Sequence, residues 1–543
     1  MRRFTMAWVL VGGTLAGCGD DVPDDVGGTA DSGSGGSTGA SSSEGPAADS
    51  SDDDEPADSS GGTTGAPEQP DPLPPLSAAP LTTEETLVTV LPAPAERIGD
   101  PRIPEEIVSL LADGHGDFEL AEGEPIIDVT QTGDSPTPPG PNAQLLTRFV
   151  HLADSQLADD ESPTRVIGLD DFAGGGFRPA ETYGCHVLDA AVRTINRVHE
   201  DLPLDFVVLG GDNTDSAQGN ELAWFLGVMD GLGPIHCDSG DDNDPEPGEG
   251  NDPKDPFTPV GLDVPWLWVT GNHDTLVQGN FLIASRLEAA IGTIAAGGTR
   301  DWTQPGGPAV TGSVPADPAR ALGTQTAILT AVAASGDGHG IDDDVIARGE
   351  ADYTFDVEGT DVRLIVLDTT AFEAGGSEGL LLDAEVDSFL RPALDTAEAD
   401  GKRVILVSHH ASGSLTGASD DAVGTADFRL LLGEYDNVLM HLCGHSHQHS
   451  ARLVEPMGGT PYWEVITSAL MDYPNQMRVI EVHDQDNGEY RIQMVAFDFQ
   501  ADDDPMGEAA RALLVLDYTT GWDPADAPGD LEDRNVSLYV PVP

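Results

Sequence analysis

The stretch at residues 438–449 reads VLMHLCGHSHQH, and it decides the fold that we expect. A short apolar run ends at Gly444, and His445 and His447 follow directly, with His441 and His449 on either side. Apolar runs of this length that stop at a glycine are typical of strands buried on both faces. The stretch therefore predicts a buried strand whose carboxyl end presents several imidazoles.

Four further apolar runs end in polar residues in the same way. They are residues 145–156 (LLTRFVHLADSQ), which end in Asp154 and Gln156; 205–215 (DFVVLGGDNTD), which contain Gly211 and Asp212; 265–274 (PWLWVTGNHD), which end in Asn272, His273 and Asp274; and 402–410 (KRVILVSHH), which end in His409 and His410. Helix-compatible stretches lie between the runs, for example at residues 185–200 and 382–397. This alternation predicts an α/β fold, in which ligands gather outside the carboxyl ends of the strands.

The polar residues at these strand ends indicate a metal site. A single Asp or His at the end of a strand is usually a turn or capping residue. Five such groups in succession, all with oxygen or imidazole donors, are difficult to explain in that way. Burying carboxylates and histidines together without a cation has a large desolvation cost. The sequence therefore predicts that the strand ends converge on bound metal.

Four short motifs occur in a characteristic order: GD at residues 211–212, GNHD at 271–274, HH at 409–410 and GHSH at 444–447. In this order they resemble the motifs of the calcineurin-like metallophosphoesterases, a superfamily of dinuclear phosphoesterases. Stretches such as ADSQLADDESPTR and YWEVITSALMDYP are similar to a secreted bacterial branch with Gln in the first metal motif. The resemblance runs from about residue 149 to residue 447. It implies an α/β fold, a four-layer α/β/β/α sandwich with two mixed sheets.

The resemblance also implies two divalent metal ions, with Mn, Fe or Zn as the expected metals. The implied ligands are Asp154, Gln156 and His447 at the first site, Asp212 as the bridge, and Asn272, His409 and His445 at the second site. Such a pair would activate a hydroxide for attack on phosphorus and neutralise charge on the phosphoryl oxygens. The implied function is metal-dependent hydrolysis of a small phosphoester substrate, either a monoester or a diester.

The GNHD motif supplies the expected catalytic residues. We expect His273 to donate a proton to the departing alkoxide or to orient the phosphate, and Asp274 to fix the tautomer of His273. Asn272 could also position the phosphate through its amide. The alternative for His273 is a structural hydrogen bond to a neighbouring loop. We interpret Asp215 as a loop residue or a supporting residue rather than a ligand.

Three other histidines match no ligand position of the superfamily. They are His410, His441 and His449, which we interpret as supporting or surface residues. His409 is preferred over its neighbour because the superfamily's ligand is the first histidine of the pair.

Gln156 departs from the superfamily's usual first motif, which is Asp, any residue, His. An amide oxygen is a neutral and harder donor than imidazole, so we expect the first site to bind zinc less strongly and to tolerate manganese or iron better. An alternative function follows, in which the chain is a catalytically weak, metal-stabilised binding or scaffold lipoprotein. The presence of His273 favours the enzyme, since a scaffold needs no proton donor.

The N-terminal sequence resembles a bacterial lipoprotein signal. Residues 1–18 contain two arginines, an apolar run too short to span a bilayer and small residues before Cys18, which would be lipidated. Residues 19–80 are rich in Gly, Ser and Asp, and they predict a disordered acidic tether. We therefore expect an exported lipoprotein of the bacterial cell envelope, at the outer membrane or cell surface, held to the membrane by the lipid at Cys18.

The folded region is expected to have three parts. They are an N-terminal extension at residues 81–145 that packs on the domain, a catalytic domain at 146–500 and a C-terminal extension at 501–543. Insertions are expected near residues 238–255 and 278–347. The first is acidic and rich in Pro and Gly, which predicts a solvated excursion, and the second predicts short helices and loops beside the site.

The charge balance excludes one class of partner. The chain has 24 Lys and Arg against 96 Asp and Glu, a formal net charge of −72. Most of its surface would repel a polyanion, so duplex nucleic acid is an unlikely partner, and a nuclease acting on duplex DNA is disfavoured. The sequence predicts no particular oligomeric state.

Cysteine usage adds an expectation about covalent structure. After Cys18, the chain contains Cys185, Cys237 and Cys443. Disulfides persist in oxidising compartments, so an exported chain is expected to pair two of these residues. We predict a disulfide between Cys185 and Cys237, which lie in loop-like sequence, and a buried thiol at Cys443.

Overall fold

The computed structural model describes most of the chain. The described residues are 70–165, 177–240, 252–285, 291–292, 294–304, 306–307, 309–417 and 419–541. The expected signal segment with Cys18, the tether as far as residue 69, and residues 241–251 of the acidic insertion lie outside these ranges. Within them, no helix combines the length and the apolar character that a membrane crossing requires.

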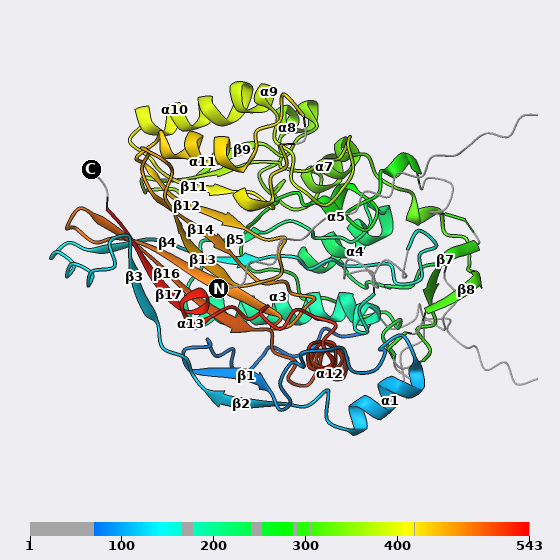
Figure 1. Cartoon of the computed structure of the whole chain (residues 1–543). Coiled ribbons are helices and arrows are strands. Elements are labelled where there is room, and N and C mark those ends of the chain that lie inside the picture. Colours follow the sequence, from blue (N-terminus) through cyan, green and yellow to red (C-terminus); the bar gives the residue numbers. More distant parts are fainter. Residues whose placement is uncertain are drawn as a thin grey trace, which may run out of the picture. The chain divides into compact units, whose positions relative to one another are not determined.

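The larger sheet has seven strands in the order β3-β17-β16-β15-β4-β5-β6. Strands β3, β17, β16, β4 and β5 of this sheet are labelled in Figure 1. The bounds are β3 Ile127–Thr130, β4 Gln144–Leu152, β5 Phe206–Leu209, β6 Trp266–Leu267, β15 Gln476–Asp484, β16 Glu489–Asp498 and β17 Val536–Pro541. Strands β4, β5 and β6 are parallel, whereas β15 pairs antiparallel with both β4 and β16. Strand β17 pairs with β16 and β3, so residues from both expected extensions complete this sheet.

The smaller sheet has six strands in the order β13-β14-β12-β11-β10-β9. The bounds are β9 Tyr353–Asp356, β10 Val362–Val366, β11 Arg403–Val407, β12 Val438–Cys443, β13 Ser450–Val454 and β14 Tyr462–Ile466. The four central strands are parallel, and β9 and β13 are antiparallel at the two edges. Both main sheets are therefore mixed.

Two antiparallel ribbons lie outside the main sheets. They are β1 Glu85–Thr89 with β2 Phe118–Glu122, and β7 Ile294–Arg300 with β8 Ala309–Ser313. The second ribbon lies within residues 278–347, for which we expect only short helices and loops. Glycine-rich sequence has little helix propensity, so this part of the stretch does not form a helix.

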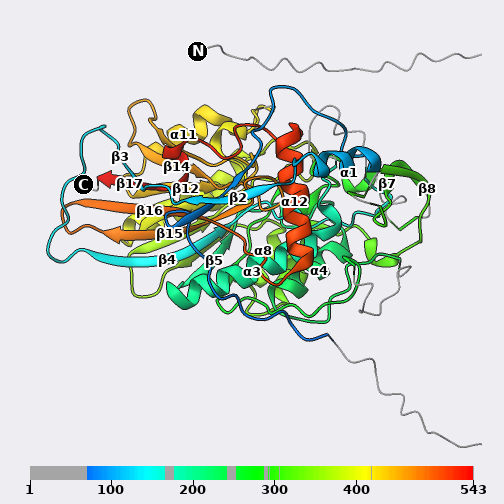
Figure 2. The same ribbon diagram turned by 90° about the horizontal axis from the view of Figure 1, so that it is seen from below.

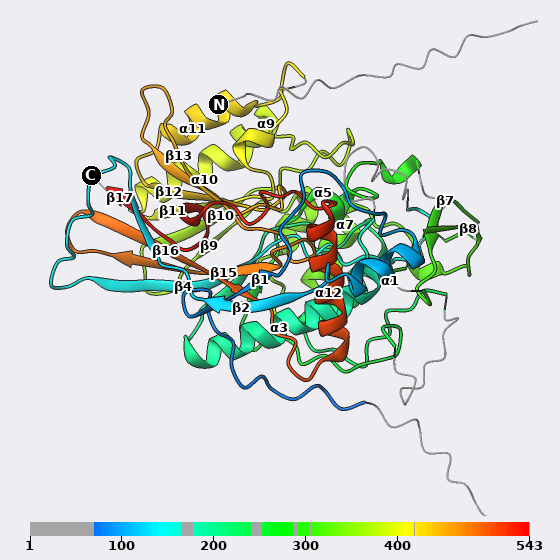
Figure 3. The same cartoon turned by 60° about the horizontal axis from the view of Figure 1, so that its bottom comes forward.

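The helices complete the fold. Their bounds are α1 Pro104–Ala112, η2 Glu181–Tyr183, α3 Gly184–Asp201, α4 Gly219–Met229, α5 Asn272–Thr275, η3 Ile283–Ser285, η4 Pro318–Arg320, α7 Gln325–Ala333, α8 Asp343–Arg348, α9 Asp383–Glu385, η5 Val386–Leu390, α10 Arg391–Ala399, η6 Ser412–Ser414, α11 Thr425–Gly433, α12 Pro505–Thr520 and α13 Leu531–Arg534. Helix α12 packs against α3 and α1 (Figure 3).

The two sheets pack face to face between layers of helices. Leu364 and Ile405 on the inner face of the smaller sheet join the main core with the larger sheet. Their neighbours Ile365 and Leu406 point to the other face and join a second core with α10 and α11. Helices α3 and α12 cover the outer face of the larger sheet, as the view from below shows (Figure 2). The predicted α/β/β/α architecture with two mixed sheets is confirmed.

The helix predicted at residues 382–397 is present, but it contains one wider turn. The chain is helical without a break through α9, the π-helical turn η5 and α10. Pro392 lies in the first turn of α10 and has no backbone N–H, which removes one hydrogen bond of the preceding turn. The other predicted helix, at residues 185–200, corresponds to α3.

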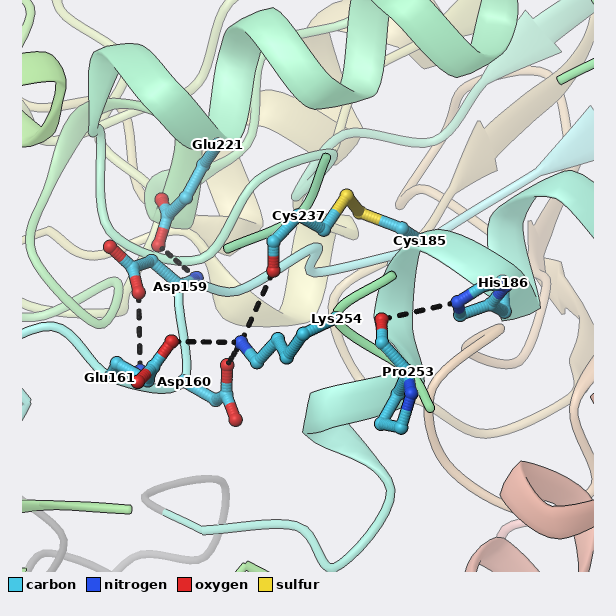
Figure 4. The surroundings of a disulfide bond; sticks show 9 residues. All are labelled: Asp159, Asp160, Glu161, Cys185, His186, Glu221, Cys237, Pro253 and Lys254. Atoms are coloured by element: carbon cyan, nitrogen blue, oxygen red, sulfur yellow. Dashed lines mark hydrogen bonds and ion pairs between the residues drawn. A yellow bond between two sulfur atoms is a disulfide. The ribbon is translucent and has the colours of Figure 1, made fainter. Parts of the chain in front are cut away.

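Cys185 and Cys237 are joined by a disulfide at the start of α3 (Figure 4). Beside it, Lys254 is only 1% exposed, and its Nζ donates to Asp160 Oδ1 at 2.6 Å and to the carbonyl of Cys237 at 3.1 Å. The described flanks of the acidic insertion are therefore buried, which the prediction of a solvated excursion did not anticipate. These flanks are buried because Lys254 binds Asp160 in the loop after β4 and the carbonyl of Cys237. Cys443 is a buried free thiol.

Replacing both Cys185 and Cys237 by alanine is expected to lower the free energy of unfolding by about 2–5 kcal/mol. The bond joins residues 52 positions apart, and a cross-link of that span removes many conformations from the unfolded chain. Urea denaturation followed by circular dichroism measures the effect. Reducing agent should shift the wild-type midpoint by a similar amount and leave the double variant unchanged. An equal midpoint for the reduced and oxidised wild type would contradict the prediction.

Candidate metal centre

The carboxyl ends of five parallel strands meet at one rim of the two sheets. Gly210 directly follows β5, and His409 follows β11 in the other sheet. The carbonyl of Gly210 accepts a hydrogen bond from His409 Nδ1 at 2.7 Å. The backbone N–H of His445, after β12, donates to Asp154 Oδ2 after β4 at 3.0 Å. These contacts bring residues far apart in sequence into one cluster, as the strand-end pattern predicts.

A first group of possible ligands consists of Asp154, Asp212 and His447. One ligand atom from each lies within 4.8 Å of the others. His447 Nε2 is 3.3 Å from Asp154 Oδ1, and both aspartates are almost fully buried. Two carboxylates and one imidazole form a donor set that suits a divalent transition-metal ion.

A second group consists of His409, His410 and His445, again with ligand atoms within 4.8 Å of one another. His409 Nε2 is 3.0 Å from Asp212 Oδ2 and 3.1 Å from Asn272 Oδ1. The Nδ2 of Asn272 donates to the carbonyl of Gly279, so its oxygen faces the cluster. Asp212 therefore lies between the two groups, at the place that the bridging role requires.

His410 has protein partners at both ring nitrogens. Its Nδ1 is 2.9 Å from Thr369 Oγ1, and its Nε2 is 3.2 Å from the carbonyl of Ser377. Its ring packs against that of His445, with ring centroids 4.4 Å apart. This arrangement fits a supporting residue better than a ligand.

Two further histidines are buried away from the metal centre. His441 lies between Glu464 and Ser408, and His449 is held by Arg478 and Gln476. Both make structural hydrogen bonds inside the fold.

The backbone at the strand ends is unusual. Of the eleven non-glycine residues with positive φ among the described residues, five are candidate ligands: Asp154, Gln156, Asp212, His445 and His447. Left-handed backbone is unfavourable for such residues and tends to persist at functional sites. The glycines of the motifs permit this crowding. A Cβ on Gly211 would lie 2.6 Å from His409 Nδ1, and one on Gly444 would lie 2.6 Å from Asp154 Oδ2.

Gln156 provides a direct test of whether the residues fit a metal. Its Nε2 is 3.3 Å from both Asp212 Oδ2 and His447 Nε2, and its Oε1 is buried without a hydrogen-bond partner in the described part of the chain. A half-turn of the amide places the oxygen where Nε2 lies, among the atoms of the first group. A buried acceptor that lacks a donor, beside two carboxylates and an imidazole, fits a cation.

The charges of the site favour a cation as well. Burial would lower the pKa of His409, but Asp212 raises it to about 9. Burial would also lower the pKa of His447, but Asp472 and Asp154 raise it to about 10. His445 differs, since burial and the neighbouring His409 lower its pKa to about 3. The carboxylates thus attract positive charge to the two groups, and the same field favours divalent ions, which bind deprotonated ligands.

His273 lies at the more open side of the cluster, with a side chain 12% exposed. Its Nδ1 is 3.2 Å from Asp215 Oδ1 and 2.9 Å from the carbonyl of the same residue. Its Nε2 is 4.0 Å from Asp212 Oδ2, so this nitrogen faces the metal centre. The side chain of His447 is 17% exposed, so substrate can approach from this side.

The structure corrects the role predicted for Asp274. Its carboxylate accepts hydrogen bonds from the backbone N–H groups of Asn213, Thr214 and Gly271, at 2.8 to 3.0 Å. Asp215, not Asp274, lies against the ring of His273. Asp274 instead holds the loop after β5 against the loop after β6, because its carboxylate accepts from Asn213 and Thr214 in the first loop and from Gly271 in its own turn.

Sequence reasoning missed Asp472 and Arg178. Asp472 accepts a short hydrogen bond from His447 Nδ1 and pairs with Arg178 through both carboxylate oxygens. Asp472 follows β14, which is parallel to β12. The rule that located the other residues, a polar group after a buried parallel strand, could therefore have located Asp472 in the sequence YWEVITSALMD.

Gln156→His is expected to tighten zinc binding at the first group on the order of tenfold, because imidazole suits zinc better than an amide oxygen does. Isothermal titration of the metal-free protein with Zn²⁺ measures the change. The second group serves as an internal control, and its affinity should stay the same. Unchanged or weaker zinc binding at the first group would show that Gln156 does not reach the metal.

Comparison with known proteins gives one family. Residues 147–449 match the family model of the calcineurin-like phosphoesterases. No curated protein matches the chain significantly.

Several solved structures show a weak likeness. A dimetal phosphatase from Danio rerio is 12% identical, and the match covers 66% of this chain and 100% of that one, with a TM-score of 0.35. A sulfate thiohydrolase, SoxB, from Thermus thermophilus is 15% identical, and the match covers 70% and 60%, with a TM-score of 0.28. A purple acid phosphatase from yellow lupin seeds is 12% identical, and the match covers 70% and 54%, with a TM-score of 0.27. These scores are too low to support any conclusion about function.

Proposed function

Because the chain belongs to the calcineurin-like phosphoesterase family, we propose that it hydrolyses a small phosphoester with two divalent cations held at the metal centre. The observation that carries the proposal is the position of Asp212. Its carboxylate lies in the group with Asp154 and His447, and it is also 3.0 Å from His409 of the other group. A carboxylate shared by two ligand sets is what a dinuclear centre requires.

The residues of the metal centre have different proposed roles in the reaction. Two divalent cations at such a centre polarise the phosphoryl oxygens and lower the pKa of the attacking water. Asp154, Gln156 and His447 would hold the first cation, and Asn272, His409 and His445 the second. Hydrogen bonds to backbone carbonyls fix two of these donors, since Gly210 accepts from His409 and Gly279 accepts from Asn272.

His273 is the proposed proton donor to the leaving group. Asp215 accepts from the Nδ1–H of the His273 ring. When the ring is protonated to the imidazolium, its Nε2–H faces the centre, where the proton can pass to the oxygen of the departing alcohol. A negative charge on that oxygen is unfavourable beside side chains that are as buried as those of Asp212 and His409. Proton donation is therefore most important for esters of weakly acidic alcohols.

We also propose a location and a substrate size. The signal-like sequence that ends at Cys18 supports an exported lipoprotein of the bacterial cell envelope, and the disulfide between Cys185 and Cys237 supports an oxidising compartment. The net charge of −72 disfavours duplex nucleic acid, and a small phosphoester is therefore the proposed substrate.

Hydrolysis of 4-nitrophenyl phosphate and of bis(4-nitrophenyl) phosphate tests the proposal. The protein is stripped with a chelator and reloaded with Mn²⁺, Fe²⁺ or Zn²⁺. We expect metal-dependent release of nitrophenol from at least one ester and none from the stripped protein. Binding of two ions without turnover of either ester would favour the alternative of a metal-stabilised scaffold, for which Gln156 is the relevant departure from the family motif.

A further inference from the structure

Two histidines of the metal centre are each backed by a carboxylate and an arginine. On one side, His447 Nδ1 donates to Asp472, and Arg178 holds the same carboxylate through Nε and through Nη2, the latter at 3.1 Å. Asp472 follows β14 and Arg178 precedes η2. This set of three side chains therefore connects the first metal group to the start of α3.

On the other side, His273 Nδ1 donates to the backbone carbonyl of Asp215 at 2.9 Å and lies 3.2 Å from Oδ1 of the same residue. The other oxygen of Asp215 accepts from Arg165 Nη1 at 2.8 Å. His273 thus has a support related to that of His447, with Asp215 between an imidazole and an arginine, although its hydrogen bond is to the carbonyl and its contact with the carboxylate is an ion pair. We call these two sets the Arg178 arm and the Arg165 arm.

Glu181 joins the two arms. Its Oε1 accepts from Arg165 Nη2 at 2.7 Å and from the backbone N–H of Arg178 at 3.2 Å. Its Oε2 is 2.6 Å from Arg300 Nη2. The three arginines face three carboxylates, those of Glu181, Asp215 and Asp472, and all six residues are at most 6% exposed. The formal charges of this buried network therefore balance.

The arginines alter how the carboxylates act. Arg178 pairs with both oxygens of Asp472, and Arg165 Nη1 donates to Asp215 Oδ2 at 2.8 Å. Each guanidinium therefore holds its carboxylate in place against the imidazole on the other side. A carboxylate that accepts from one ring nitrogen fixes the tautomer and directs the other nitrogen to the metal or substrate.

We propose that Arg178 and Arg165 are positioning residues with separate tasks, the first setting the metal affinity of His447 and the second setting proton delivery by His273. The inference deepens the proposed function and rests on it for the second task alone. The first task concerns metal binding, which needs no turnover.

Arginine is needed at these positions because of its shape. A guanidinium presents several N–H groups in a rigid plane, so Arg178 engages both oxygens of Asp472, and Arg165 reaches Asp215 and Glu181 at once. Lysine keeps the charge but has a single ammonium on a flexible chain. Arg→Lys therefore loosens each carboxylate without leaving it unpaired, and it limits the loss of folding that a neutral residue would cause.

The test compares Arg178→Lys, Arg165→Lys and a matched control. The control is Arg320→Lys, because Arg320 is also fully buried and donates to a carboxylate, that of Asp159 at 2.8 Å, but belongs to neither arm. Circular dichroism first establishes that each variant is folded. Calorimetric titration of the stripped proteins with Mn²⁺ then gives both affinities, and turnover of phenyl phosphate and 4-nitrophenyl phosphate gives the dependence on the leaving group.

Arg178→Lys is expected to weaken one of the two Mn²⁺ sites about 10- to 100-fold and to leave the other unchanged. Arg165→Lys is expected to keep both affinities and to slow phenyl phosphate at least about tenfold more than 4-nitrophenyl phosphate, whose leaving group needs no proton. Arg320→Lys should do neither. The proposal is overturned if Arg178→Lys binds both ions like the wild type, or if the two arm variants change the same quantity.

Failure of the proposed function gives a different result. If the wild type binds two Mn²⁺ ions but hydrolyses neither these monoesters nor bis(4-nitrophenyl) phosphate, the enzymatic proposal fails, while the titration of Arg178→Lys still decides the first task. If the wild type is active and the arm variants behave like Arg320→Lys, the positioning proposal alone fails.

Discussion

Asp212→Asn should reduce turnover on the order of a thousandfold or more and lower the bound metal from two ions per chain toward one. Asp212 lies between the two ligand groups, 3.0 Å from His409 Nε2 and 3.3 Å from Gln156 Nε2. Asparagine has nearly the same shape but lacks the negative charge, and its nitrogen donates where a metal needs an acceptor. The change therefore removes the shared ligand and one unit of charge neutralisation.

Elemental analysis of the purified variant and an ester assay measure the two effects together. Asp498→Asn is a suitable control, because Asp498 is 3% exposed and its carboxylate accepts from Gln476 in the larger sheet, outside the metal centre. It should keep two ions and wild-type turnover. Retention of two ions and full activity by Asp212→Asn would contradict the bridging assignment.

His273→Ala should lower turnover by about 100- to 10,000-fold for esters of weakly acidic alcohols, and much less for 4-nitrophenyl phosphate. The ring of His273 presents Nε2 to the centre while Asp215 holds Nδ1, which is the arrangement of a proton donor. His273 is in neither ligand group, so the bound metal should stay at two ions.

Plotting turnover against the pKa of the leaving alcohol checks the prediction. A steeper dependence for His273→Ala than for the wild type is the expected result. An equal loss for all esters would assign His273 to phosphate binding, and a loss of metal would assign it to the ligand set. Asp274→Asn should not change the slope, because Asp274 contacts backbone N–H groups and not the ring of His273.

The strand-end pattern made much of the site predictable. The apolar content of each buried run predicts a strand. Neighbouring parallel strands have their carboxyl ends at the same edge of the sheet. Asp154, Asp212, Asn272, His409, His445 and His447 meet as this rule implies. The same rule agrees with the strand order, because β4, β5 and β6 are adjacent in the larger sheet and β11 and β12 are adjacent in the smaller one.

Other features depend on contacts that no local pattern contains. Arg178 and Asp472 are 294 residues apart, and nothing in either stretch marks the other as its partner. Strand β17 lies between β3 and β16. Which sheet edge a strand pairs with depends on the other edges that are available, and local strand propensity does not predict this. Whether Asp215 or Asp274 contacts the ring of His273 depends on the paths of two loops, which the local sequence does not determine.

The measurement that tests the central claim most directly is the anomalous scattering of crystals soaked in Mn²⁺. We expect two peaks, one among Asp154, Asp212 and His447 and the other beside His409 and His445, with the carboxylate of Asp212 between them. A single peak away from these side chains, or no peak at millimolar Mn²⁺, would contradict the assignment of a dinuclear centre.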